Sequence, residues 1–113
     1  METKRQLKIA RLLQKDLGEI FQIESRGLFH GNMITVTKVY VTNDLSMARA
    51  YLSLFGPEDK QVLFGKINQH RKEIRHQLAI RVKNQIRAIP ELEFHIDDSL
   101  DYIDNIEKLL KSE

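Results

Sequence analysis

The spacing between apolar residues changes along this chain, and each change marks an expected boundary between a helix and a strand. The first apolar stripe falls within an arc of about 80° of a helical projection and comprises Ile9, Leu13, Leu17 and Ile20. Thr3 stands where a residue would cap this helix. From residue 33 the chain becomes β-branched and aromatic, which favours a strand. We therefore expect a helix over residues 3–24 and a strand over residues 33–42.

The apolar register of the expected first strand slips by one residue. Ile34 and Val36 have one parity, whereas Val39 and Val41 have the other. A β-bulge near Thr37-Lys38 would keep all four side chains on one buried face, because a bulge inserts one extra residue into a strand. The sequence therefore predicts a bulge at this point.

The rest of the chain continues this order of elements. We expect a strand over residues 47–55, a helix beginning at Pro57, a helix over residues 73–87, a strand over residues 92–96 and a short helix after Asp98-Ser99. The short link between the first two strands makes them antiparallel. In the second helix, Val62, Leu63 and Ile67 are expected to face inward. The sequence predicts one α+β domain over residues 1–113, with an acidic segment at 98–113.

Charge is distributed unevenly along the second half of the chain. Residues 66–87 carry seven Lys or Arg side chains against one acid, and residues 88–113 carry two against eight acids. Asymmetry of this kind points to a polyanionic partner, but the two blocks can also attract each other within the fold. Both interpretations stay open at this point.

Two cationic stripes are the candidate partner-binding residues. The first lies opposite the apolar face of the opening helix, within an arc of about 60°, and comprises Lys4, Lys8, Arg11 and Lys15. The second lies on the third helix and comprises Lys72, His76, Lys83 and Arg87, with Arg71 and Arg75 as further candidates around the same helix. Lys38 on the first strand is a further candidate. An ordinary solvated helix face is the alternative for each stripe.

The chain lacks the residue patterns of common catalytic and cofactor sites. It has no cysteine, no Gly-rich phosphate loop and no metal-ligand spacing among its four histidines. No apolar run is long enough to cross a membrane. We therefore expect no catalytic activity, no cofactor, no metal and no membrane partner, and a cytoplasmic protein that acts as a monomer.

Two segments resemble a known family. Ile34–Leu54 is similar to the signature hairpin of the ribosome-binding factor A family, with Thr42–Leu45 matching its Ser/Thr-x-Asp-Leu turn and Ala48–Leu52 its second strand. A second stretch resembles the family's Ile-Arg-x-x-Leu helix start, Pro-x-Leu-x-Phe strand and Asp-x-Ser end. Its matching residues are Ile74, Arg75, Leu78, Arg81, Pro90, Glu91, Leu92, Phe94 and Asp97-Asp98-Ser99. The resemblance covers roughly residues 4–110.

The resemblance implies both a fold and a function. The fold would be a type II KH-like domain, α-β-β-α-α-β, with a three-stranded mixed sheet and its helices on one face. The function would be binding of the immature small (30S) ribosomal subunit and its 16S rRNA, with assistance in late maturation and in growth at low temperature. In place of the family's Ala-x-Gly helix kink this chain has His70-Arg71-Lys72. We interpret these side chains either as direct phosphate contacts or as a sign of a milder kink.

Two other functions remain open from the residues alone. A protein-interaction adaptor would bind its partner through the acidic segment 98–113. The basic side chains of residues 66–87 would then only pair with acidic groups of the same chain. A general single-strand RNA binder would use Tyr40 and Tyr51, which alternate with Lys38 and Arg49 on the outward faces of the two expected strands. The same four residues also fit an ordinary cross-strand arrangement.

Overall fold

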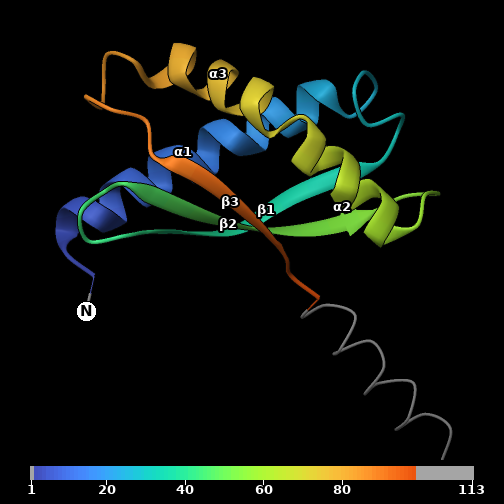
Figure 1. The fold of residues 1–113 in the computed structure, drawn as a ribbon, viewed down its shortest axis with the longest axis horizontal. Helices are drawn as coiled ribbons and strands as arrows, with labels where there is room; N and C mark the ends of the chain where they lie inside the picture. Colours follow the sequence, from blue (N-terminus) through green and yellow to red (C-terminus); the bar gives the residue numbers. More distant parts are fainter. Residues whose placement is uncertain (1, 99–113) are drawn as a thin grey trace, which may run out of the picture.

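The computed structural model describes residues 2–98 and gives the element order that the sequence predicts. The elements are α1 (Lys4–Glu24), β1 (Met33–Val41), β2 (Met47–Phe55), α2 (Lys60–Gln69), α3 (Arg71–Val82) and β3 (Glu91–Ile96). All three helices lie on one side of the sheet (Figure 1). The helix expected after Asp98-Ser99 and most of the acidic segment 98–113 lie outside the described residues. The α+β class is thus confirmed.

The sheet is mixed, as the resemblance implied. Its strand order is β1-β2-β3, with β1 antiparallel to β2 and β2 parallel to β3. The parallel pair needs a crossover connection, which α2 and α3 provide above the sheet (Figure 1). Side chains of the sheet alternate except at an irregularity in β1, so that one face packs against the helices and the other carries polar and aromatic residues. The core therefore lies between the sheet and the three helices.

The bulge in β1 is confirmed. The pairing of β1 with β2 shifts between Val36 and Lys38. Ile34 and Val36 before the shift are buried, and so are Val39 and Val41 after it. The extra residue, Thr37, donates its hydroxyl to Asp97 Oδ2 at 2.6 Å. This contact links the bulge to the chain immediately after β3.

The start of α1 is fixed by its cap and by one buried amide. Thr3 and Gln6 form a capping box, in which each side chain accepts the backbone N–H of the other. The Gln6 side chain is 2% exposed, and its Nε2 donates to Val41 O at 2.8 Å. Gln6 therefore joins the first turn of α1 to the end of β1.

The helix expected from Pro57 begins three residues later than predicted. Its N-cap is Asp59, whose carboxylate accepts the N–H groups of Gln61 and Val62. Glu58 lies before the helix, where it forms an ion pair with Lys66 and accepts a hydrogen bond from Asn32. The inward orientation expected for Val62 is wrong, since this residue is 52% exposed, whereas Leu63 and Ile67 are buried.

The helix expected over residues 73–87 is displaced toward the N-terminus. It spans Arg71–Val82 and is followed by a turn in which Gln85 N–H and Ile86 N–H both donate to Val82 O. The turn redirects the chain so that Ile86 packs against the core from outside the helix. Lys83 and Arg87 therefore lie beyond α3, not on it.

Candidate nucleic-acid interface

Four cationic side chains form a line along α1 on the side away from the sheet. We call this set the α1 stripe, and it comprises Lys4, Lys8, Arg11 and Lys15, all exposed. None of the four forms an ion pair with another residue of the described range 2–98. Their charges are therefore available to a partner, as far as the described part of the chain goes.

A clamp between α1 and α3 orients the two helices. Arg81 Nε donates to Asp16 Oδ1 at 3.0 Å, and Arg81 Nη2 also pairs with Glu19. At the other end of α3, the His70 ring contacts Phe29, which follows α1. The helices therefore run antiparallel, and the segment after α3 comes to lie beside the first half of α1.

This arrangement brings Arg87 to the α1 stripe. A groove of about 720 Å³ between α1 and the segment that follows α3 is lined by the cations Arg5, Lys8 and Arg87. The remaining lining residues are Ile9, Leu12, Gln85 and Ile86. We call it the Arg87 groove. Two cationic segments that are distant in sequence thus meet on one surface, where their side chains can neutralise phosphates together.

Arg5 is a member of this groove that the sequence analysis did not select. It lies about 60° from Lys8 around the helix, outside the α1 stripe. Only the packing of residues 83–90 against this side of α1 makes Arg5 part of a shared surface. The sequence alone shows only that Arg5 is a cation next to the stripe, and this does not predict that it shares a surface with Arg87.

The second predicted stripe is not a continuous surface. Lys72 and His76 are exposed on α3, whereas Lys83 and Arg87 lie in the connection that follows it. The prediction assumed that helical geometry continues to residue 87, and it is wrong because α3 ends at Val82. Arg71 and Lys72 lie at the opposite end of α3 from Arg87.

Arg75 interacts with the chain itself. Its Nη2 donates to Ile89 O at 2.7 Å and its Nε donates to Pro90 O at 3.1 Å. Nη2 also lies 3.4 Å from Glu91 Oε1. Arg75 therefore holds the chain at the start of β3, and a role for it in RNA contact stays a prediction.

Lys38 lies on the opposite face of the molecule. It shares the sheet face that the described helices do not cover with Tyr40, Arg49 and Tyr51. There Arg49 Cζ lies 6.0 Å from the centre of the Tyr40 ring, and Tyr51 stacks on His95 with ring centres 5.3 Å apart. The structure does not bring Lys38 together with the α1 stripe.

The junction of α2 and α3 is a kink at a single residue, His70. Its backbone N–H donates to Lys66 O and Ile67 O, and its carbonyl accepts from Ile74 N–H. Its φ of −98° and ψ of 12° depart from helical values without entering the left-handed region. The kink therefore forms without glycine, and Arg71 and Lys72 begin α3 with both side chains exposed.

The described residues contain no group of three or more His, Cys, Asp or Glu side chains suited to a metal ion. Over the same range, no helix is long and apolar enough to span a membrane.

The element order, the mixed sheet and the basic helical side together define a KH-like α+β domain with a candidate nucleic-acid-binding surface. The family model for ribosome-binding factor A matches residues 5–110. The chain belongs to the ribosome-binding factor A family.

Relatives and solved structures agree with this assignment. The chain is 47% identical over 111 residues to ribosome-binding factor A of Christiangramia forsetii, covering 97% of this chain and 85% of the relative. It is 43% identical to the Cytophaga hutchinsonii protein of the same name over 110 residues, covering 97% and 83%. The crystal structure of ribosome-binding factor A from Thermus thermophilus superposes with a TM-score of 0.66 at 25% identity, covering 80% of this chain and 94% of that one.

A second Thermus thermophilus structure concerns a complex. It is a homology model of ribosome-binding factor A fitted into a cryo-EM map of a 30S complex, with a TM-score of 0.61 and 28% identity. The match covers 79% of this chain and 91% of that one.

Proposed function

We propose that this protein binds the immature small ribosomal subunit and its 16S-type rRNA in the cytoplasm and assists late maturation, including at low temperature. The observation that carries the proposal is the meeting of the α1 stripe with Arg87 across one groove. Family membership and the 30S complex of the Thermus thermophilus relative support the choice of partner.

The mechanism rests on phosphate contacts and shape. Lysine and arginine side chains on a rigid helix neutralise RNA phosphates and release counterions, which gives affinity without reading sequence. The protein holds a folded segment of rRNA in position while the subunit matures, and no covalent bond is made or broken. We assign the contacts to the α1 stripe together with Arg5 and Arg87, with Arg71, Lys72, His76 and Lys83 as additional contacts.

Co-sedimentation in a sucrose gradient tests the proposal. We expect the protein to migrate with free small subunits and to be depleted from assembled ribosomes. Recovery only at the top of the gradient, with purified immature subunits present, contradicts it. If trimming residues 99–113 abolishes binding whereas reversal of the basic residues does not, the acidic-adaptor function replaces this one.

A further inference from the structure

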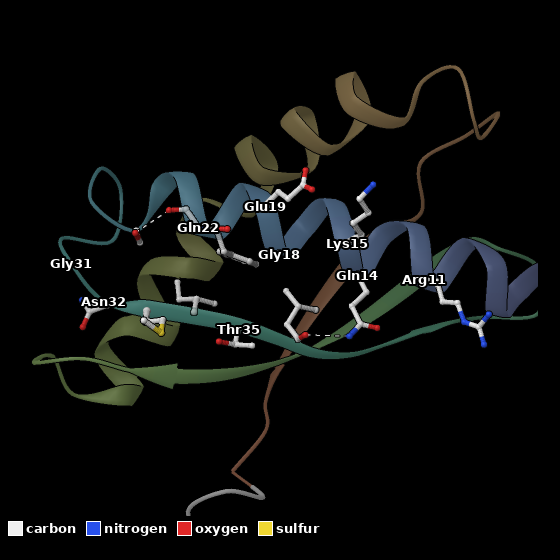
Figure 2. A pocket seen from close by; sticks show the side chains of 14 residues that line it. Arg11, Gln14, Lys15, Gly18, Glu19, Gln22, Gly31, Asn32 and Thr35 are labelled. Carbon is white, nitrogen blue, oxygen red and sulfur yellow. Dashed lines mark hydrogen bonds between the residues drawn. The ribbon is translucent and has the colours of Figure 1, made fainter.

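A second groove lies on the other side of the α1 stripe, between α1 and the edge strand β1 (Figure 2). It has a volume of about 730 Å³, and we call it the β1 groove. Arg11, Lys15 and Gly18 line it from α1, and residues 33–36 line it from β1. Lys8, in contrast, lines the Arg87 groove, so the stripe forms the ridge between the two grooves.

The backbone of β1 is open toward this groove. Leu52 O accepts the Asp97 N–H, so the backbone groups of Leu52 turn toward β3 and not toward β1. Val36, its partner in the β1–β2 register, therefore turns its own groups away from β2, and Ile34 does the same by alternation. Gln14 Nε2 donates to Val36 O at 3.3 Å, which confirms this direction.

Of the outward backbone groups of Ile34 and Val36, three have no hydrogen-bond partner in the described part of the chain. They are the N–H and C=O of Ile34 and the N–H of Val36. An unpaired strand edge of this kind offers donors and an acceptor in a fixed spacing. Both residues line the groove, although each is largely buried, at 5% and 7% exposed.

Gly18 is unexplained by packing within the chain. It lies in the interior of α1, where glycine is less favourable than alanine. A Cβ atom added to it would meet no atom within 4 Å. Because Gly18 lines the β1 groove, the missing side chain leaves room for a group that comes from outside the chain (Figure 2).

The charge of the groove favours an anion. Arg11 and Lys15 are four residues apart, which places their Cα atoms about 6 Å apart along the helix axis. Glu19 is the acid among the lining residues, and it forms an ion pair with Arg81, which Asp16 shares. The two exposed cations at the rim are not matched by an unpaired acid of the groove.

We propose that the β1 groove holds an unpaired segment of RNA, an inference that rests on the proposed function and extends it. Successive phosphates contact Arg11 and Lys15, and the sugar–phosphate backbone passes over Gly18. Base edges form hydrogen bonds with the open backbone groups of Ile34 and Val36. A duplex does not fit this mode, because its base edges are already paired.

Two glycine substitutions test the inference. Gly18→Leu fills the groove, whereas Gly65→Leu is its control, because a Cβ at Gly65 on α2 also meets no atom within 4 Å and Gly65 does not line the groove. Both variants replace a helical glycine by a better helix former, so both should unfold at a higher temperature than the wild type. Fluorescence anisotropy then measures binding of a labelled uridine or adenosine oligonucleotide of about eight nucleotides, and of the same strand in a duplex.

We expect Gly18→Leu to weaken single-strand binding by about tenfold, and Gly65→Leu to leave it unchanged. Equal binding by the two variants overturns the inference, as does a wild-type protein that prefers the duplex or binds no oligonucleotide. If Gly18→Leu weakens binding to small subunits but not to oligonucleotides, the groove holds a polypeptide strand and the RNA inference is wrong. None of these outcomes bears on the Arg87 groove, so the proposed function would stand.

Discussion

Arg81 on α3 and Asp16 on α1 form a hydrogen-bonded ion pair with 3.0 Å between Nε and Oδ1. The pair sets the side-by-side placement of the two helices, and Glu19 extends it to a second carboxylate. The positions of Arg87 and the α1 stripe relative to each other depend on this placement.

We expect Arg81→Ala to lower the free energy of unfolding by about 1 kcal/mol, since the pair is only partly shielded from water. The measurement is urea denaturation of Arg81→Ala, Asp16→Ala and the double variant. Because the two residues share one interaction, the double variant should lose less than the sum of the single losses, by about 0.5 kcal/mol or more. Strict additivity of the two losses would show that the pair does not hold the helices together.

Gln6 is the second polar contact on which the fold depends. We expect Gln6→Ala to lower the free energy of unfolding by about 2 kcal/mol, because it leaves a buried carbonyl at Val41 without its donor and removes half of the capping box. The control is Gln14→Ala, whose amide makes longer contacts of 3.3 and 3.4 Å at a partly buried site. Its loss should be below about 1 kcal/mol. Similar losses in both variants would contradict the assigned role of Gln6.

Asp44 gives the hairpin turn a dependence on pH. Hydrogen bonds from the Ser46 side chain and backbone, followed by one from Thr42, lower the pKa of Asp44 below its ordinary value of 3.8. The stability that the ionised carboxylate contributes is therefore fully present above the unfolded-state pKa and is lost as the pH falls through the lower folded-state pKa.

Thermal unfolding of the wild type and Asp44→Asn checks this assignment. The wild type should unfold at a higher temperature at neutral pH, and the difference should disappear once the pH falls below the lowered folded-state pKa of Asp44. A difference that stays constant from neutral pH into acid would show that the charge of Asp44 does not stabilise the turn.

Some features of the fold follow from local pattern, and others depend on long-range packing. The slip between Ile34–Val36 and Val39–Val41 is a local signal, and it predicts the bulge at Thr37 correctly. The end of α3 at Val82 has no such signal, because helical spacing continues to Ile86, and Ile86 still packs against the core from beyond the helix.

The candidate site shows the same division. The α1 stripe can be read from one helix, because all its members lie on that helix. Arg5 and Arg87 join it only through the placement of the chain after α3, and the hydrogen bonds of Arg75 to the carbonyls of Ile89 and Pro90 likewise depend on that placement. Helical projection of one segment contains no information about these contacts.

The salt dependence of binding reports the number of phosphates engaged. With about six contacts, the logarithm of the affinity for small-subunit RNA should fall with the logarithm of salt concentration with a slope of about −4 to −5. Lys8→Gln should flatten the slope by roughly one contact, and Lys38→Gln, on the opposite sheet face, should not change it. Equal effects of the two substitutions would contradict the assigned surface.

Charge reversal across the Arg87 groove tests the central claim most directly. The test variant is Lys8→Glu/Arg87→Glu, which reverses two cations that line the groove. The control is Arg26→Glu/Lys38→Glu, which changes the net charge by the same amount at exposed cations outside the groove. In co-sedimentation with immature small subunits, we predict that the first variant is lost from the subunit fractions and that the second is retained. Retention of Lys8→Glu/Arg87→Glu at the wild-type level, with its fold intact by circular dichroism, would contradict the account.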